Sequence, residues 1–280
     1  MLKSDHHFDD LLAAAGLARS TYFYHLKQLD NPDKYTELKD AIKTIFEKMK
    51  QRYGYRRIHT ELRKQGWQVG HKLVYKLMDQ MRLKSKVRPR RKYKSYKGQT
   101  SRIADNLLDR NFTPDKPNTV WVSDVTEFRV AGTKVYLSPV MDLYDRTILA
   151  HTLSMSPSTK FTSASLNNAI AWHQPGEGLM VHTDQGFQYQ HVSWRRLIES
   201  VGGIQSMSRK GNCYDNAVIE NFFGHLKTEM YHGEKFASVE EFCQDVDDYI
   251  FWYNNDRLQQ RFKGLTPMQY RNQTLEALAA

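Results

Sequence analysis

The segment 119–130, TVWVSDVTEFRV, alternates β-branched, aromatic and polar residues as a strand does, and it carries a carboxylate at Asp124, between Ser123 and Val125. Two later segments repeat this combination. In 179–189, LMVHTDQGFQY, Asp184 follows a mainly apolar run. In 212–229, NCYDNAVIENFFGHLKTE, Glu220 lies close to aromatic residues. A carboxylate beside apolar surroundings is costly unless a positive group binds it. The three acids therefore predict a shared positive partner.

The segments around the first strand predict an α/β fold. Further strand-like runs cover 134–144, 147–155, 178–184 and 203–208, and helical periodicity covers 163–173, 193–202 and the Glu220 segment. This order predicts a mixed five-stranded sheet covered by helices. Pro139 lies inside the second strand and has no N–H to donate, so we expect a bulge there or an early strand end at Ser138.

The region before the sheet is helical. Residues 9–29 predict a short helix, a turn at Gly16 and a second helix capped by Ser20, which is the pattern of a helix-turn-helix or of a plain helical hairpin. Thr21 and Tyr24 on that second helix are candidate DNA-reading residues. A second helix pair follows over 55–66 and 71–81, after an amphipathic connector, with these residues expected to face inward: Ile58, Leu62, Leu73, Leu77 and Met81.

The charge is concentrated in one segment. The chain has 41 Lys and Arg against 31 Asp and Glu, and residues 81–103 contain ten basic residues and no acidic one. A solvated linker is one interpretation, but the interleaved tyrosines favour a phosphate-binding arm. Its candidate DNA contacts are Arg90, Arg91, Lys92 and Lys94. The chain shows no signal peptide and no apolar run of membrane-spanning length, which predicts a soluble, cytoplasmic protein.

Five segments in order resemble one known family. They are YGYRRIHTEL (53–62), WVSDVTEF (121–128), HTDQGFQY (182–189), SRKGNCYDNAVIENFFGHLKTE (208–229) and YNNDRLQQRFKGLTPMQYR (253–271). The chain is similar to the integrase-core DDE transposases that bacterial insertion sequences encode in their second reading frame, which are relatives of retroviral integrases. The resemblance implies a ribonuclease H-like catalytic core, and a bacterial, nucleoid-associated location.

The resemblance also assigns residues. It implies that Asp124, Asp184 and Glu220 are the catalytic acids and metal ligands, with thirty-five residues between the last two as in the family. It implies that Lys227 contacts transposon-end DNA. Converging carboxylates repel one another, and a hard divalent cation with oxygen ligands relieves this repulsion. We therefore expect two Mg²⁺ or Mn²⁺ ions, which would align the attacking and leaving oxygens of a phosphodiester.

The expected function is a transposase that cleaves the 3′ ends of an insertion sequence and joins them to new DNA. Its expected partners are double-stranded DNA (transposon terminal inverted repeats and target DNA), further copies of the chain on that DNA, and the product of the first reading frame. Two alternatives stay open. One is a structure-selective nuclease of the ribonuclease H type, and the other is a catalytically inert sequence-specific DNA-binding regulator.

Other polar residues near the expected site have structural interpretations. Asp142 and Asp145 are expected to pair with Arg146 or to cap the turn after the second strand. Asp215 is expected to cap the Glu220 helix, and His182 to be either a packing residue or a residue that supports the acids of the site.

We expect four regions along the chain. Residues 1–50 would form the helix-turn-helix and connector, 51–103 the second helix pair with the basic arm, 104–232 the catalytic core, and 233–280 a C-terminal helical region. Two apolar rows, 38–49 and 242–253, are candidates either for contacts between chains or for packing within one chain.

Overall fold

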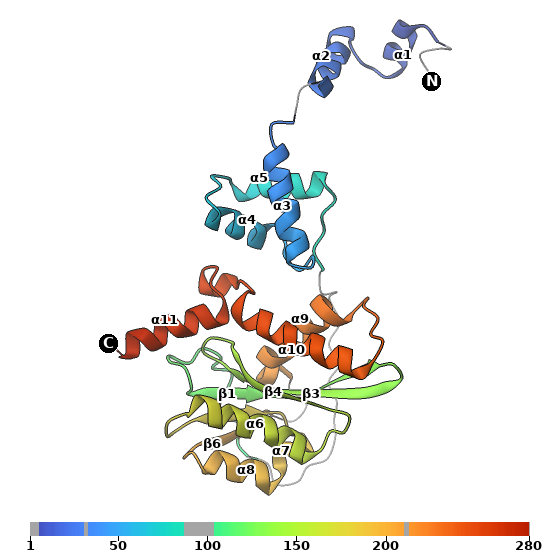
Figure 1. Ribbon diagram of the computed structural model, residues 1–280. Helices are drawn as coiled ribbons and strands as arrows, with labels where there is room; N and C mark the ends of the chain where they lie inside the picture. The colour runs from blue at the N-terminus through green and yellow to red at the C-terminus, as the bar shows by residue number, and fades with distance from the viewer. Residues whose placement is uncertain (1–5, 31–32, 87–103, 210–212, 280) are drawn as a thin grey trace. The chain divides into compact units, whose positions relative to one another are not determined.

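The computed structural model describes residues 6–30, 33–86, 104–209 and 213–279 (Figure 1). The chain divides into two compact units, residues 1–85 and 86–280. The four regions expected from the sequence are a finer division and stay a prediction. Within the described residues, no helix has both the length and the apolar character needed to cross a membrane.

The first unit is helical. Its elements are α1 (Phe8–Ala14), α2 (Arg19–Asp30), α3 (Thr36–Lys48), α4 (Tyr55–Lys64) and α5 (His71–Gln80). The α1–α2 turn uses Gly16 with φ +63°, a conformation that glycine adopts without strain. The expected cap at Ser20 is wrong. The carbonyl of Ala18 already accepts the N–H of Tyr22 at 3.0 Å, so the helix begins before Ser20, at Arg19.

The helices α3, α4 and α5 share one small core. Its buried residues are Leu38, Ile42, Ile45, Phe46, Ile58, Leu62, Val74, Leu77 and Met78. The row 38–49 therefore packs within the chain against α4 and α5. Leu73 and Met81, which we expected to face inward, are only half-buried, because Val74 and Met78 occupy the inner face of α5.

The second unit contains the mixed sheet. Its strands are β1 (Val120–Ser123), β2 (Thr126–Val130), β3 (Thr133–Asp142), β4 (Ile148–Ser154), β5 (Met180–Thr183) and β6 (Ile204–Met207). The long strand β3 pairs antiparallel with β1, β2 and β4, and β1, β5 and β6 run parallel to one another. This confirms the α/β fold with a mixed sheet, although it has six strands because the expected first strand is divided in two.

The division of the first strand lies opposite Pro139. Ser123 pairs with Val140 and Thr126 pairs with Leu137, so the same register sets Asp124 opposite Pro139. Proline has no N–H for a neighbouring strand, and the ladder is interrupted here. The early strand end expected at Ser138 is wrong, because β3 continues to Asp142. A bulge is present, but between β3 and β4 at Val140 and Met141.

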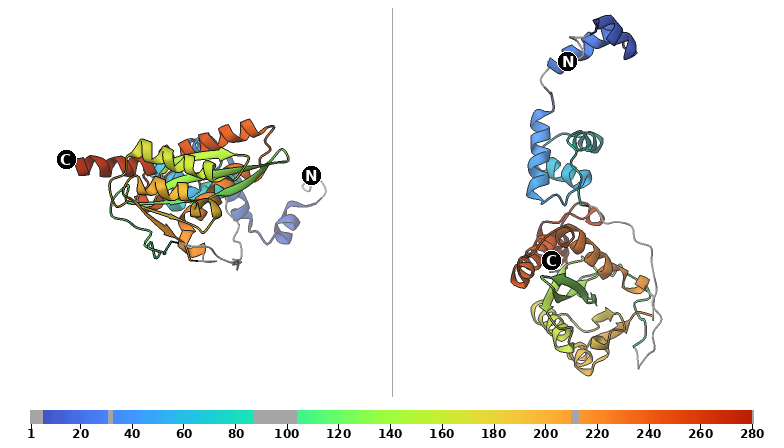
Figure 2. Two further views of the ribbon diagram at one scale, coloured as in Figure 1. Left: turned by 90° about the horizontal axis from the view of Figure 1, so that it is seen from below. Right: turned by 90° about the vertical axis from the view of Figure 1, so that its right-hand side faces the viewer.

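Helices cover both faces of the sheet (Figures 1 and 2). One face packs against α9 (Ala217–Leu226) and α10 (Val239–Asn255), and the other against α6 (Thr159–His173) and α8 (Val192–Glu199). The shorter or terminal elements of the unit are α7 (Phe187–Gln190), η2 (Cys213–Asn216), η3 (Lys227–Tyr231), η4 (Gln260–Phe262) and α11 (Pro267–Ala279). The short helix α7 was not expected from the sequence.

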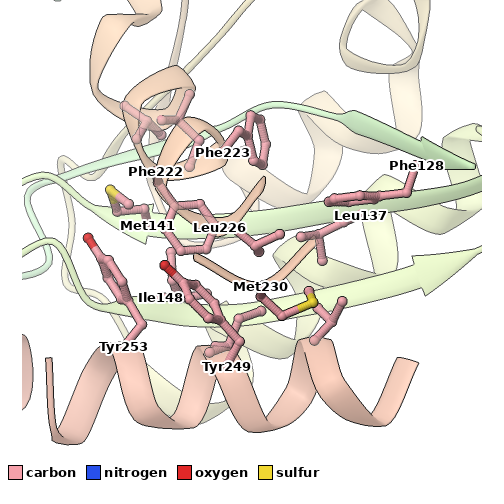
Figure 3. Close-up of a cluster of buried hydrophobic side chains, with 14 of the residues drawn as sticks. Phe128, Leu137, Met141, Ile148, Phe222, Phe223, Leu226, Met230, Tyr249 and Tyr253 are labelled. Carbon is pink, nitrogen blue, oxygen red and sulfur yellow. The ribbon is translucent and has the colours of Figure 1, made fainter. Parts of the chain in front are cut away.

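The core between the sheet and α9 and α10 is rich in aromatic residues (Figure 3). From α10 it contains the whole predicted apolar row Phe242, Val246, Ile250 and Tyr253. This row therefore packs within the chain. The core cluster fixes α9, the helix that carries Glu220, against the sheet that carries Asp124.

Candidate active site

Asp124 and Asp184 lie at the ends of two neighbouring parallel strands. In the β1–β5 register Ser123 pairs with Thr183, and the two aspartates are the residues that follow directly. The carboxyl ends of paired parallel strands meet at one edge of the sheet. The sheet therefore brings these two acids together, although sixty residues separate them in the sequence.

Local hydrogen bonds orient both carboxylates. The Oδ1 atom of Asp124 accepts the N–H of Val125 at 2.7 Å, and the Oδ1 atom of Asp184 accepts the N–H of Gly186 at 2.9 Å. Neither Oδ2 atom accepts a hydrogen bond from another described residue. Each carboxylate thus keeps one oxygen for a further partner.

Gly186 is required by space. A Cβ atom at this position would lie 2.5 Å from Nε2 of Gln188 and 3.0 Å from Oδ1 of Asp184. The groups that approach residue 186 closely are therefore these two side chains.

Glu220 lies one turn into α9, at the margin of the core stripe of that helix. The apolar stripe is buried throughout: Ile219, Phe222, Phe223 and Leu226 in α9, and Met230 just beyond its end. The side chain of Glu220 is half-buried, and its charge acts on the carboxyl group of Asp124. The helix thus carries the third acid toward the sheet edge that holds the other two.

Two acids of this site, Asp124 and Asp184, have raised pKa values. Burial raises the pKa of Asp124 well above its usual value, the charge of Asp184 raises it further, and Glu220 adds a smaller contribution. Burial also raises the pKa of Asp184. The charge of Lys227 opposes the effect at Asp124 by lowering its pKa. The site thus concentrates negative charge that a cation would stabilise.

The donor set suits a hard divalent cation, because all three groups are carboxylates and hard cations prefer oxygen ligands. In the described part of the chain, however, no three His, Cys, Asp or Glu side chains lie close enough to hold one ion together. A shared ion therefore requires these side chains to move closer to one another.

The structure describes only some of the candidate DNA contacts. Lys227 follows α9 as the first residue of the π-helical turn η3 (Lys227–Tyr231), and its Nζ atom lies 5.1 Å from the ring centroid of Phe128. Thr21 and Tyr24 are exposed on α2, Tyr24 by 61%. The four candidates of the basic arm, Arg90, Arg91, Lys92 and Lys94, lie outside the described residues.

Asp142 and Asp145 are held by a different arginine from the one expected. The Nη1 atom of Arg271 donates to Oδ2 of Asp142 at 2.9 Å and to Oδ2 of Asp145 at 2.6 Å. Both aspartates also accept backbone N–H groups in the turn, from Tyr144 and Thr147, so the expected turn capping is present. Arg146 is not their ion-pair partner.

Asp215 is not the cap of the Glu220 helix. Asn216 precedes α9, and the buried carboxylate of Asp215 instead accepts hydrogen bonds from Nε of Arg209 at 2.9 Å and Nε of Arg110 at 3.0 Å. Two guanidinium groups from distant segments thus satisfy its charge, which a capping pattern in the local sequence does not reveal. These contacts hold its pKa well below the usual range, with the hydrogen bond from Arg209 as the largest cause.

His182 is a packing residue, as expected. Its ring is buried between Ser206 and Ser208, with Nδ1 2.8 Å from Oγ of Ser206 and Nε2 3.1 Å from Oγ of Ser208. Burial lowers the pKa of His182 to about 4, so the ring is neutral at neutral pH.

Comparison with known proteins agrees with this architecture. Two segments, 114–213 and 220–275, match the family described as "Integrase core domain", and 34–92 matches "HTH-like domain". The match to "HTH-like domain" thus covers α3, α4 and α5 and begins after the end of α2.

Several full-length relatives carry transposase names. The putative transposase InsK for insertion sequence element IS150 of Escherichia coli K12 is 43% identical, over 98% of this chain and 96% of the relative. The transposase InsF for insertion sequence IS3A of the same organism is 34% identical, over 84% of this chain and 82% of the relative. A probable transposase for IS1353 of Shigella flexneri is 39% identical over 94% of this chain, which spans 52% of that longer protein.

Solved structures of similar fold are more distant. The simian T-cell lymphotropic virus intasome in complex with PP2A regulatory subunit B56 gamma contains a chain that is 16% identical, with a TM-score of 0.48 over 78% of this chain and 70% of that one. Nearly full-length matches at 34–43% identity and the two integrase-core segments are decisive. The chain belongs to the integrase-core DDE transposases of bacterial insertion sequences, of the second-reading-frame type.

Proposed function

We propose that this transposase cleaves the 3′ ends of its insertion sequence and transfers them to new DNA with Asp124, Asp184 and Glu220 as its catalytic acids. The observation that carries the proposal is the convergence of charge on Asp124. This residue follows Ser123, the strand partner of Thr183, and its pKa is raised by burial and by the charges of Asp184 and Glu220. Acids grouped in this way on a rigid sheet and helix are typical of a functional site.

The three acids would hold divalent metal ions, Mg²⁺ or Mn²⁺, and we propose two of them. When bound, such ions supply charge stabilisation and alignment for the oxygens that enter and leave the phosphorus. The Oδ2 atoms of Asp124 and Asp184, which accept no hydrogen bond from other described residues, are the oxygens best available for this purpose. Glu220, a half-buried residue in the first turn of α9, would supply the third carboxylate ligand.

The other residues of the site would bind and orient the DNA. Lys227 is near enough for its charge to lower the pKa of Asp124, so its ammonium group is suited to a phosphate beside the reacting one. Gly186 keeps the loop after β5 close to Asp184 and so fixes the direction of that carboxylate. No covalent intermediate with the protein is needed, because water and then a DNA 3′-hydroxyl serve as nucleophiles.

Binding to DNA would depend on several parts of the chain. The basic residues Arg90, Arg91, Lys92 and Lys94 would contact phosphates without reading sequence. Thr21 and Tyr24 would contact bases at the terminal inverted repeats. Because both transposon ends must be joined in one reaction, we propose that several copies of the chain assemble on the DNA, together with the first-reading-frame product where that is required.

A strand-transfer assay with labelled end DNA tests the proposal. We expect the wild type to cleave and join the DNA when Mg²⁺ is present, and Asp124→Asn, Asp184→Asn and Glu220→Gln each to fall to background. Glu199→Gln, a substitution of the exposed last residue of α8, is the matched control and should react as the wild type does. Near wild-type joining by Glu220→Gln would contradict the assignment.

The same assay separates the two alternatives from transposition. A structure-selective nuclease would cleave the DNA without joining it. A catalytically inert regulator would bind end DNA without either reaction. Joining of the labelled end to a second DNA molecule is the product that only the transposase forms.

A further inference from the structure

A pocket of about 430 Å³ lies beside Glu220 in the second unit. It is bounded by the first half of α9, by Met141 and Arg146 at the end of β3 and in the turn that follows, and by the end of α10 with the adjoining turn η4. Glu220 lines this pocket, and its charge also acts on Asp124. The pocket therefore adjoins the proposed catalytic site without containing either aspartate.

One wall of the pocket carries an incompletely bonded arginine. Arg146 is only 5% exposed, and its Nη2 atom donates to the carbonyl of Phe112 at 2.7 Å. Its Nε and Nη1 atoms have no hydrogen-bond partner among the described residues. Buried donors are nearly always bonded, because an unbonded one is costly. An acceptor supplied from outside the chain would remove this cost.

The nearby acids do not supply that acceptor. Asp142 and Asp145 are bonded to Arg271. Glu229 is bonded to Arg257, whose Nε and Nη2 atoms lie 3.0 and 2.7 Å from its two carboxylate oxygens. The Arg257–Glu229 pair therefore adds no net charge to the pocket wall that Arg257 forms.

A second cation lies close to Arg146. Burial and, as the second cause, the charge of Arg261 lower the pKa of Arg146 to about 10, and both arginines line the pocket. Arg146 is therefore still protonated at neutral pH. Arg261 is exposed and lines the pocket, where it is reachable from solvent. Two neighbouring cations exceed the single negative charge of Glu220, which makes the pocket suitable for an anion.

The remaining walls agree with an anion of limited size. Met141, Phe222 and Tyr253 line the pocket, and they lie together at one end of the core cluster (Figure 3). Ala217 and Val218 line it from the first turn of α9.

We propose that this pocket takes one backbone phosphate of the DNA strand bound at the active site, held by Arg146 and Arg261. The proposal rests on the proposed function, because it is DNA that would present a phosphate beside Glu220. The phosphate would be a non-reacting neighbour of the one that is cleaved. Arg146 and Arg261 would thus be positioning residues that fix the strand relative to the catalytic acids.

Binding measurements on the full chain test this proposal without requiring catalysis. The probe is a set of end-DNA duplexes, each with one neutral methylphosphonate in place of a single phosphate near the cleavage position, measured by fluorescence anisotropy in EDTA. At one position we expect the neutral linkage to weaken wild-type binding about tenfold but Arg261→Gln binding less than about twofold, because the contact is already lost. Equal responses of wild type and Arg261→Gln at every position would overturn the proposal.

A control variant and a second pocket variant extend this test. Arg195→Gln removes an exposed arginine from α8, on the opposite face of the sheet, and should keep the wild-type pattern. Arg146→Lys keeps the charge but loses the planar set of donors, and should lose sensitivity at the same position as Arg261→Gln. If Arg146→Lys does not fold, the Arg261→Gln comparison still decides.

Inorganic phosphate distinguishes the source of the anion. If phosphate raises the melting temperature of the wild type but not of Arg261→Gln, while the methylphosphonate scan shows no difference, the pocket binds free phosphate and the DNA assignment is wrong. Failure of the proposed function has a separate signature. In that case the acid variants would still join DNA, whatever the binding scan shows.

Discussion

The Oδ1 atom of Asp184 accepts the N–H of Gly186 at 2.9 Å, and the same oxygen lies 3.0 Å from the place where a side chain on residue 186 would begin. A side chain on residue 186 would therefore force the carboxylate of Asp184 or the side chain of Gln188 to shift. Since φ of Gly186 is −58°, the requirement is one of space and not of backbone conformation.

Gly186→Ala should reduce catalysis much more than stability. The added methyl group must shift either the buried side chain of Gln188 or the carboxylate of Asp184, and a displaced reacting group loses rate, up to about 100-fold for a shift of about 1 Å. Gly176→Ala is the control, because a Cβ atom there meets nothing within 4 Å. Strand-transfer rates and melting temperatures of the two variants give the comparison. A wild-type rate for Gly186→Ala would show that Asp184 needs no such placement.

Asp124→Asn should stabilise the chain in EDTA at alkaline pH. Burial and the charges of Asp184 and Glu220 raise the folded-state pKa of Asp124, so its ionised form opposes folding. In the wild type this cost is absent below the unfolded-state pKa of Asp124. It grows as the pH rises above that value and is complete once the pH exceeds the folded-state pKa. The melting temperature of Asp124→Asn should therefore exceed that of the wild type at pH 8, by more than it does at pH 5. A variant that melts earlier at pH 8 would mean that Asp124 is stabilised by a structural partner.

Arg271→Met should destabilise the second unit strongly. Arg271 is 3% exposed and bonds to Asp142, Asp145 and Asn118. Its removal leaves two buried carboxylates without their common cation, which typically costs about 3–5 kcal/mol. Denaturant unfolding of the full chain measures the loss. Arg195→Met, on the surface of α8, is the control and should change stability by less than about 0.5 kcal/mol.

Much of this fold could be predicted from the sequence because its strongest signals are local. Alternation of apolar residues predicted the strands, and the period of Ile219, Phe222, Phe223 and Leu226 predicted the buried face of α9. The break between β1 and β2 was not predicted, since it depends on which residue of β3 lies opposite, here Pro139.

The polar contacts around the site were less predictable because they join distant segments. Arg271 is 129 residues from Asp142, whereas Arg146 is only four residues away and was the natural expectation. Asp215 likewise bonds to Arg110 across 105 residues. The anion pocket gave no signal in the sequence, since it depends on the meeting of the turn after β3 with α9 and the end of α10.

The central claim is that Asp124, Asp184 and Glu220 together bind the divalent ions that the reaction uses. The uptake of Mn²⁺ by the full chain bound to end DNA, followed by the electron paramagnetic resonance signal of the free ion, tests this claim most directly. We predict that the wild type and Glu199→Gln take up two ions per chain, as expected for a two-metal site, and that Glu220→Gln takes up fewer and binds them more weakly. Equal uptake by Glu220→Gln and the wild type, at equal affinity, would contradict the account.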